Sequence, residues 1–493
     1  MQADYDNLTM KTPLCLRKLH HPALGVRLPE IFLPGIIAAL KKHRVAAGLM
    51  LSFGRETAPE AVIRAPAGAY PITQGHTGTS IRAYQTAAAR AARAAGIPLE
   101  VEADHLIIIG SPERAAARIT GVHTRETLDP KQLEASLSYN QRCLEEAAAA
   151  GVVGCFTTDT SDLFRLEVDG WKPAAVKRAF ARTFKAAERE RLLRDYAGQS
   201  FAFVAADRGR VKLAFTAPQV MRLALKYQAS LAVNLELFKR IQRQLHRPFS
   251  FEISMDETEG LTPLPDAFFY LREWTRRGAP VDYFAPNLGF KKRADYDGSL
   301  KDLEVRGRKL HAVAASFDGA MLSIHSGSGS TPYSGKGRGT YRALLRATGG
   351  RLKYKISGVY YELLLEILAA HRKGSPERKL FEEVFAHTFL RCVEEWMDRG
   401  PLATPLLEKQ IEQFSGQLNR ARKNFFPPRA DFFRFHSYLA LNLRDGRQRR
   451  FLRNALVKLY RTRPALRREV DREVQALTER LIHGLRFEKN FSA

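Results

Sequence analysis

Cysteine is scarce in this sequence, and the few cysteines are scattered. The 493 residues include four of them, Cys15, Cys143, Cys155 and Cys392, and no two form a CxxC pair. This spacing argues against a disulfide framework and against a structural zinc site built from cysteines. We therefore expect the chain to work in a reducing compartment, the cytoplasm.

Long apolar runs are also missing. No stretch approaches the ~20 consecutive apolar residues that a membrane-spanning helix needs. The N-terminal segment MQADYDNLTMKTPLCLRKLHH has no apolar core of signal-peptide length. We therefore expect no membrane partner. The hydrophobic content of 45% is that of an ordinary globular protein with a large core.

Acidic residues are outnumbered by basic ones. Lys and Arg total 78 against 52 Asp and Glu, which gives a formal net charge of +26. Such an excess raises nucleic acid, anionic lipid or a small anionic substrate as partners. Much of it falls in stretches where basic and apolar residues alternate at helical spacing, which is typical of a solvated helix face. The sequence has no RNP, KH, zinc-finger or basic-zipper signature, so we expect no specific nucleic-acid partner.

Eight apolar strand-like runs recur along the chain, with helical segments rich in Ala, Leu, Glu, Lys and Arg between them. Repeated strand and helix predict parallel strands joined by right-handed crossovers. Eight such units predict an α/β fold, a (β/α)8 barrel of the TIM type. A doubly wound open sheet is the alternative, but no GxGxxG follows the first predicted strand. The eight runs are 46–53, 99–109, 152–158, 200–206, 249–255, 281–286, 320–326 and 352–358.

The pattern along the chain predicts three regions. Residues 1–40 form an N-terminal extension, residues 41–375 the catalytic barrel, and residues 376–493 an appended region that is helical only. Paired prolines in NFFPPRAD mark a break within the last region. We expect the helical region to pack on the barrel, where it closes the site or makes the subunit contact of a homo-oligomer.

The stretch SFEISMDETEG at 250–260 contains four carboxylates in eight residues. Its apolar residues alternate with Ser250, Glu252 and Ser254, as on a strand with two differently used faces. Glu252 then lies inside a buried strand, where an acid needs a partner, and Asp256 and Glu257 follow the strand's end. Crowded carboxylates need a cation, hydrogen bonds or solvent, so the stretch predicts a metal or acid/base site. A solvated acidic turn is the alternative.

Other polar residues gather where the predicted strands end. In barrels this carboxyl-terminal face carries the chemistry, because strand ends fix side-chain directions while loops vary. Two histidines, His105 and His325, with the buried Glu252 form an N,N,O set that suits a divalent transition metal acting on a carbonyl. The gathered residues include Asp104, His105, Asp256, Glu257, His325, Ser326 and Lys355.

Cations and a Gly/Ser-rich loop supply candidate anion sites. Lys291, Lys292 and Arg293 follow a predicted strand and suit a substrate carboxylate or phosphate, and a solvated basic turn is the alternative. The loop after His325, SGSGSTPYSGKG, offers backbone N–H groups to an anion or is a flexible surface loop. It lacks the GK[ST] order of a Walker A motif. Lys355 lies in an apolar strand, where it would orient a carbonyl or pair with an acid such as Glu252, roles that we favour over a Schiff base.

These same segments, in this order, resemble the tagaturonate epimerase family of bacterial hexuronate catabolism. The matching parts are EADH at Asp104 and His105, SFEISMDETE, KRADYDG at 292–298, SIHSGS at His325, and YKISG at Lys355. They extend over most of the chain, from about residue 40 to 440. The resemblance implies a metal-assisted interconversion of D-tagaturonate and D-fructuronate that inverts one carbinol carbon.

The position of that carbon suggests a mechanism. It lies β to the ketone, so its C–H proton is not acidified, and we hypothesise a retro-aldol cleavage followed by aldol re-formation on the other face of the aldehyde. We assign a metal of the zinc, manganese, nickel or cobalt type to His105, Glu252 and His325, with His436 or water as the fourth ligand. The acid/base residues are Asp104 and Asp256, with Glu257 beside them, and the substrate-binding residues are Lys292, Arg293, Ser326 and Lys355.

Two other functions remain open from the sequence. A metal-dependent aldolase or lyase on the same barrel would release the two fragments that an epimerase retains. A protein without catalysis would bind RNA or DNA through its Lys/Arg surface. Only discrimination of sequence or structure would support that function, since any protein this basic binds polyanions nonspecifically.

Overall fold

A closed barrel of eight parallel strands forms the centre of the molecule, in the order β1-β10-β9-β8-β7-β4-β3-β2. This computed structural model describes residues 15–54, 56–66, 69–70, 76–111, 113–114, 128–258, 260–420 and 425–491. The predicted (β/α)8 fold is confirmed. The barrel strands are β1 (His21–Gly25), β2 (Ala47–Ser52), β3 (Leu99–Ile107), β4 (Val153–Asp159), β7 (Ser250–Met255), β8 (Tyr283–Pro286), β9 (Met321–Ile324) and β10 (Leu352–Ile356).

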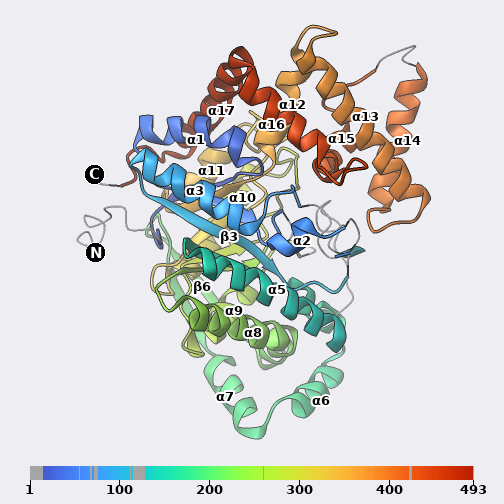
Figure 1. Ribbon diagram of the computed structural model, residues 1–493. Helices are drawn as coiled ribbons and strands as arrows, with labels where there is room; N and C mark the ends of the chain where they lie inside the picture. Colours follow the sequence, from blue (N-terminus) through green and yellow to red (C-terminus); the bar gives the residue numbers. More distant parts are fainter. Residues whose placement is uncertain are drawn as a thin grey trace.

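Helices surround this barrel (Figure 1). Two of the longest begin with a capping box, formed by Asp129 with Gln132 and by Thr216 with Gln219, which fixes where each helix starts. The helices up to the last barrel strand are α1 (Pro29–His43), α2 (Glu60–Arg64), α3 (Ile81–Ala95), α5 (Pro130–Ala150), α6 (Pro173–Thr183), α7 (Ala186–Tyr196), α8 (Ala217–Leu245), α9 (Leu264–Arg276), α10 (Leu300–Ala315) and α11 (Thr340–Thr348), with 3-10 turns η2 (Ser161–Leu163) and η3 (Leu166–Gly170).

One predicted barrel strand is wrong, and one barrel strand was missed. The run at 200–206 forms β5 (Ser200–Val204), which pairs antiparallel with β6 (Arg210–Ala214) in a separate hairpin and is partly exposed. The missing strand is β1, whose sequence HPALG contains Pro and Gly and no β-branched residue. Pro22 is tolerated there because the pairing with β2 begins only at Ala23.

The N-terminal boundary of the barrel is therefore also wrong. Because β1 and α1 belong to the barrel, residues 21–40 are not part of an extension.

The described elements after residue 375 are helical, as predicted, and α17 packs against α1 (Figure 1). The helices are close there: a Cβ at Gly35 would lie 2.6 Å from the carbonyl oxygen of Asp471. Helix α12 (Val359–Ala370) follows β10. The helices after residue 375 are α13 (Pro376–Met397), α14 (Pro405–Arg420), α15 (Asp431–His436), α16 (Phe451–Thr462) and α17 (Pro464–Leu485), with the 3-10 turn η4 (Ser437–Asn442).

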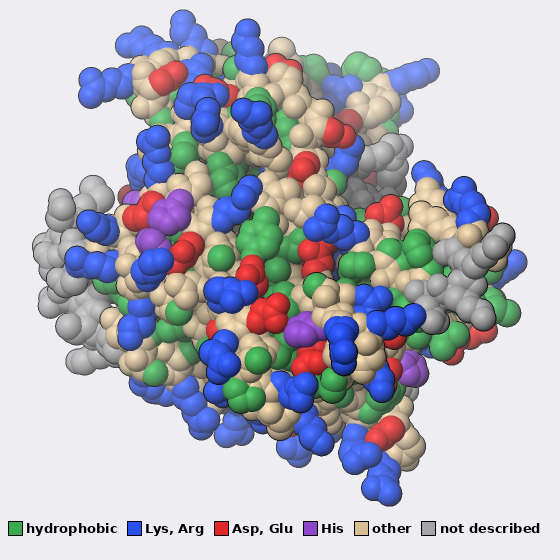
Figure 2. Space-filling model, turned by 90° about the horizontal axis from the view of Figure 1, so that it is seen from above, with side chains coloured by type: hydrophobic (Ala, Val, Ile, Leu, Met, Phe, Trp, Pro, Cys, Tyr) green, Lys and Arg blue, Asp and Glu red, His purple; other side chains and the backbone are tan. Residues whose placement is uncertain are grey.

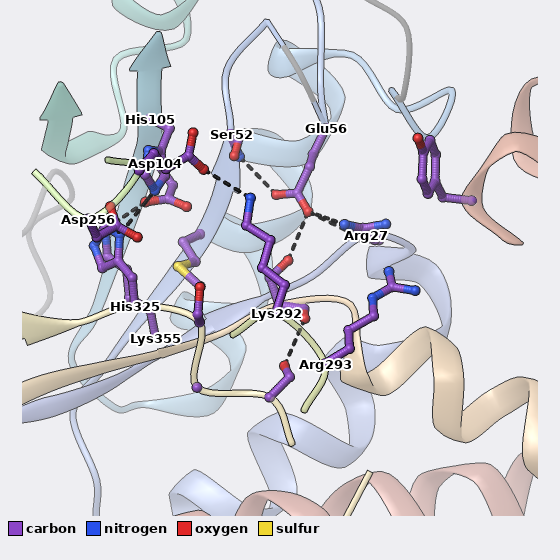
Figure 3. Close-up of a pocket in the computed structure, with 17 residues that line it drawn as sticks. Arg27, Ser52, Glu56, Asp104, His105, Asp256, Lys292, Arg293, His325 and Lys355 are labelled. Carbon is purple, nitrogen blue, oxygen red and sulfur yellow. Dashed lines mark hydrogen bonds and ion pairs between the residues drawn. The ribbon is translucent and has the colours of Figure 1, made fainter. Parts of the chain in front are cut away.

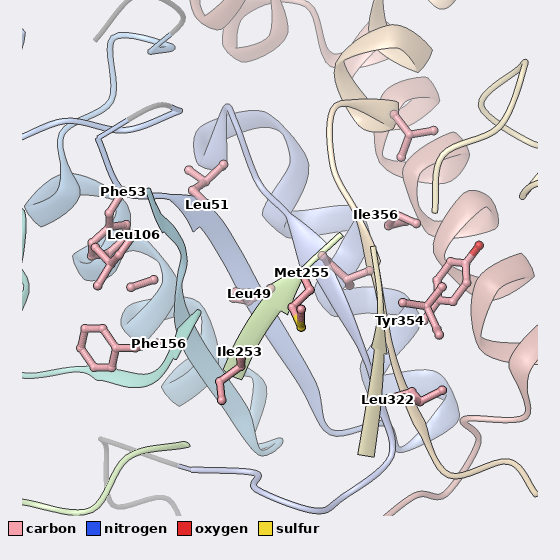
Figure 4. Packing of buried hydrophobic residues seen from close by; sticks show 14 of the residues in the cluster. Leu49, Leu51, Phe53, Leu106, Phe156, Ile253, Met255, Leu322, Tyr354 and Ile356 are labelled. Carbon is pink, nitrogen blue, oxygen red and sulfur yellow. The ribbon is translucent and has the colours of Figure 1, made fainter. Parts of the chain in front are cut away.

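Side chains alternate along the barrel strands between two environments. Leu49, Phe156 and Ile253 point outward and pack with other apolar groups beneath the helices (Figure 4). Their neighbours on the same strands point into the barrel, where β3 and β7 carry Glu102 and Glu252, both fully buried. The interior is crowded, since a Cβ at Gly48 would lie 1.6 Å from a carboxylate oxygen of Glu102. The predicted two-faced strand at 250–255 is confirmed.

The basic residues are spread over the surface. Figure 2 shows Lys and Arg side chains distributed across the whole face in view, with acidic and apolar groups between them. Many are paired, as Arg308 is with Asp207 and Arg346 with Glu304. Within the described ranges, no helix has the length and apolar character needed to cross a membrane.

Candidate active site

A cavity opens at the carboxyl ends of the barrel strands (Figure 3). Asp104, His105, Asp256, His325 and Lys355 gather on one side of it, and Arg27, Glu56 and Arg293 lie on the other. Nine of the predicted site residues line the cavity, which agrees with the expected convergence of strand ends. These nine are Asp104, His105, Asp256, Glu257, Lys292, Arg293, His325, Ser326 and Lys355.

Asp104 and His105 are consecutive residues, yet both face the cavity. Between Ala103 and Leu106, strand β3 has one residue more than its partner β4, which is a β-bulge. His105 has a φ of +50°, in the left-handed region that a residue with a side chain rarely adopts. A regular strand would send these two side chains to opposite faces, so the bulge brings both to the site.

His105 and His325 meet at the centre of the cluster. Nε2 of His105 lies 3.1 Å from Nδ1 of His325. One donor atom each from Asp104, His105 and His325 lies within 4.8 Å of the other two. The other ring nitrogen of His105, Nδ1, is 3.8 Å from the Asp159 carboxylate. Two imidazoles and a carboxylate so placed are a donor set that divalent transition metals prefer, so these residues fit a metal ion.

The third residue of this set differs from the one we predicted. Among the residues with assigned positions, no cluster of potential metal ligands includes Glu252. Its Oε1 atom instead lies 2.6 Å from Nε2 of His325, one level deeper in the barrel. A carboxylate behind a metal-ligating histidine fixes the tautomer and orientation of the ring, which is the role that this position favours.

The prediction for His436 is not supported by its position. It is the last residue of α15, does not line the cavity, and its Nε2 is 3.1 Å from Oε1 of Gln410 in α14. Burial, together with the positive charge of Arg293, lowers the pKa of His436 to about 3. The neighbouring 3-10 turn η4 contributes Tyr438 to the cavity instead.

Buried lysines hold the interior carboxylates. Nζ of Lys355 lies 2.5 Å from Asp104, 2.7 Å from Glu252 and 2.8 Å from the hydroxyl of Thr157. Lys353, one level deeper, contacts Glu102 and lies 3.1 Å from Glu252. Burial opposes their charges, but neighbouring acidic groups outweigh it and raise the pKa of both lysines: Cys155 and the carboxylates for Lys353, and the carboxylates for Lys355. Both therefore stay protonated, and Lys355 pairs with an acid as expected.

His325 lies between two carboxylates when no metal is present. Burial alone would lower its pKa, but Asp256, 3.0 Å from Nδ1, and Glu252 outweigh burial and raise the pKa to about 9. Asp256 responds in the opposite direction: burial raises its pKa, and His325 more than offsets this and brings it to about 2. At neutral pH the pair is an imidazolium with a carboxylate.

We expect the metal-free protein to lose stability as pH rises from 6.5 to 9. Folded His325 binds its proton more tightly than the unfolded chain, so its contribution is full below pH 6.5 and is lost as pH passes about 9. The loss should be roughly 3 kcal/mol. Urea unfolding of chelator-treated protein at several pH values measures it, and His325→Gln should flatten the profile in this range. An unchanged slope in His325→Gln would contradict the assignment.

The opposite side of the cavity contains residues that sequence reasoning missed. Glu56 accepts hydrogen bonds from Arg27, from the hydroxyl of Ser357 at 2.8 Å and from the backbone N–H of Ser52 at 3.1 Å. Ser52 is the next-to-last residue of the predicted strand 46–53, so its position was a usable signal. Arg27 follows the missed strand β1. No pattern in the sequence around Glu56 or Tyr438 indicates that they belong to a site.

Lys292 and Arg293 differ in their pairing. Lys292 donates to Glu257 at 3.1 Å, so these two predicted site residues bind each other. Arg293 has a φ of +54°, lies 5.4 Å from the Phe435 ring and has no carboxylate partner in the described part of the chain. Burial and the charge of Arg27 lower its pKa to about 10. Ser326, also at positive φ, lines the cavity beside His325.

The closed barrel and the charged cavity at its carboxyl-terminal face are those of the (β/α)8-barrel enzymes. A family model described as UxaE, tagaturonate epimerase, matches residues 139–396, just over half of the chain. The chain therefore belongs to the tagaturonate epimerase family.

The chain is also similar to individual proteins that are named as epimerases of this kind. A tagaturonate/fructuronate epimerase of Thermotoga maritima is 31% identical over 205 residues, which span 41% of this chain and 38% of that protein. Two structures of the fructuronate-tagaturonate epimerase UxaE from Cohnella laeviribosi share the fold. The glycerol complex has a TM-score of 0.67 at 19% identity, over 96% of this chain and 83% of that one. The native structure has 0.66 at 18%, over 97% and 83%.

Proposed function

We propose that this protein is a metal-dependent epimerase that interconverts D-tagaturonate and D-fructuronate. The observation that carries the proposal is the convergence of Asp104, His105 and His325 beside Asp256 in a member of this family. The described cysteines are all free, which fits the reducing cytoplasm.

The reaction is best served by breaking and re-forming a carbon–carbon bond. The carbon to be inverted lies β to the ketone, so removal of its C–H proton gives no stabilised anion. Removal of its hydroxyl proton instead lets the bond to the α carbon break. The bonding electrons pass to the ketone oxygen as an enediolate, and the inverted carbon becomes an aldehyde. Rotation of the aldehyde, attack by the enediolate on its other face and return of the proton complete the inversion.

Asp256 is suited to take and return that proton. It lines the cavity as a carboxylate, is bound by the Ser254 hydroxyl and faces His325. Glu257, with Lys292, provides a second acid/base group on the cavity wall. Two such groups would serve the two faces of the aldehyde.

Asp104, His105 and His325 would hold the metal, and Glu252 would orient His325 from below. A bound divalent metal would supply Lewis-acid stabilisation of the negative charge on the ketone oxygen. Lys355 binds both Asp104 and Glu252 and so fixes two carboxylates relative to each other. This assignment uses Asp104 as a ligand, whereas the sequence suggested an acid/base role.

Arg293 is suited to bind the substrate carboxylate. It lies near the N-terminus of α12, where Nη2 of Arg293 is 3.6 Å and Nη2 of Arg27 3.7 Å from the Cβ position of Gly358. Arg27 is neutralised by Glu56, so the charge of Arg293 remains for an anion. A substrate carboxylate there would receive charge-assisted hydrogen bonds. Ser326, on the loop after β9, would contact the sugar hydroxyls.

Arg293→Gln should raise the KM for D-tagaturonate by roughly 100-fold, because a charge-assisted contact to the carboxylate is lost. The value of kcat should change much less. Lys291→Gln is the matched control, since Lys291 is an exposed cation two residues away, paired with Asp297. A loss confined to kcat, or an equal effect in the control, would count against this role.

The proposed function is tested by incubating metal-loaded and chelator-treated protein with D-tagaturonate in heavy water and following the products by NMR. Metal-dependent formation of D-fructuronate without deuterium at the inverted carbon is expected. Deuterium at that carbon would retain the epimerase and exclude the carbon–carbon cleavage. Release of three-carbon fragments would indicate an aldolase, and no turnover with zinc, manganese, nickel or cobalt would overturn the proposal.

A further inference from the structure

A second cluster of metal-ligating side chains lies at the junction of α1 and α17, and it shares no residue with the cavity. His43 is the last residue of α1, and Glu479 and His483 lie one turn apart on α17. Figure 1 shows the two helices side by side. One donor atom from each of the three residues lies within 4.8 Å of the other two.

His43 presents a buried nitrogen to this junction. Its Nε2 is shielded from solvent and lies 3.5 Å from Oε1 of Glu479, at the limit of a hydrogen bond. The ring centroids of His43 and His483 are 4.5 Å apart. Buried polar atoms normally have a close partner, and this long contact is a weak one, so a cation held by the carboxylate and both imidazoles would satisfy the nitrogen better.

His483 is held in an orientation that suits a ligand. Its Nδ1 lies 2.6 Å from Oε1 of Glu488. With the proton on Nδ1 donated to Glu488, Nε2 carries the free lone pair. A carboxylate that binds the second nitrogen is the usual partner of a metal-ligating histidine.

We infer that His43, Glu479 and His483 form a second metal site, for a divalent transition metal of the zinc type. Two imidazole nitrogens and a carboxylate oxygen are donors that zinc prefers, and water can complete the coordination. Lys42, 3.0 Å from Glu479, is more than half exposed, so its displacement costs little. A metal there would tie the last helix of the chain to the first helix of the barrel.

Zinc binding to the full-length protein tests this site. All variants carry His105→Gln, which removes a ligand from both donor groups at the cavity, Asp104 with His105 and His325 and His105 with Asp159 and Glu257, so that neither obscures the result. Metal-stripped protein is titrated with zinc, its zinc content is measured after desalting, and its thermal unfolding is recorded with and without zinc. We expect one zinc per chain and a zinc-dependent rise in Tm. Adding His483→Ala should weaken zinc binding by about 100-fold or more and abolish the Tm rise.

The matched control is His371→Ala in the same background. His371 lies 3.1 Å from Glu469, also on α17, but no described cluster of three donors includes this pair. The control should bind zinc like its parent. Glu479→Gln, which preserves size, should reproduce the loss if His483→Ala unfolds the protein. Equal zinc content and equal Tm response in the His483→Ala and His371→Ala proteins would overturn the inference, as would no zinc in the parent.

Discussion

His325→Gln should lower kcat/KM for D-tagaturonate by about 10³-fold or more, because one side chain serves three partners. His325 contacts Glu252 through Nε2, and His105 and Asp256 through Nδ1. Glutamine preserves much of the volume but offers no aromatic nitrogen to a metal or to Asp256. Steady-state kinetics with a measurement of bound metal checks the result, and we expect metal at the cavity to be lost.

Two variants give this experiment its controls. His371→Gln changes a partly exposed histidine that is paired with Glu469 outside the cavity, and its activity should match the wild type. Glu252→Gln should retain metal with about 10–100-fold weaker affinity, as expected for a residue that orients a ligand. More than a tenth of the wild-type activity in His325→Gln would contradict the central place of this histidine. Full activity and metal content in Glu252→Gln would remove the orienting role.

Lys353→Met should destabilise the fold by about 3–5 kcal/mol, because it leaves buried carboxylates without their cation. The Lys353 side chain is fully buried, contacts Glu102 and Glu252, and has its Nζ 4.5 Å from the centre of the Tyr283 ring. Methionine fills the space but carries no charge. Urea unfolding compared with the wild type at constant pH and metal content measures the effect.

The control for that variant is Lys291→Met, which removes an ion pair with both side chains 67% exposed. It should cost less than about 1 kcal/mol. Adding Glu102→Gln to Lys353→Met should recover part of the stability, because one of the two stranded charges is then gone. A Lys353→Met protein within 1 kcal/mol of the wild type would show that water, and not Lys353, compensates these acids.

The barrel could be predicted because most of its strands have a recognisable residue pattern within their own sequence. The β7 strand has apolar residues at alternate positions, and the polar residues between them, such as Glu252, face the interior. β1 has no such signal, since HPALG becomes a strand only through its pairing with β2 and β10. The run at 200–206 has the composition of a barrel strand, but its backbone pairs with the adjacent β6 and not with a barrel strand.

The site could be predicted to the extent that strand ends define it. Asp256 and His325 directly follow recognisable strands, His105 lies near the end of another, and parallel strands bring their carboxyl ends together. The sequence predicted that Glu252 lies inside its strand, but it did not predict that this places Glu252 beneath His325 instead of beside it, where it pairs in register with Thr157. The prediction of His436 as a metal ligand is unsupported for a different reason: α15 packs on α14, and this contact directs the His436 side chain toward Gln410.

The closure of the barrel by β1 also has a consequence for synthesis on the ribosome. One edge of β1 pairs with β2, the next strand along the chain. Its other edge pairs with β10, the last barrel strand, with His21 opposite Lys353. At translation rates of about 5–20 residues per second, that partner emerges roughly 17–66 s later. A nascent chain therefore carries an open strand edge for this interval, and such edges template aggregation. Folding of this protein should accordingly depend on chaperones that cover the growing chain until its last strand has been synthesised.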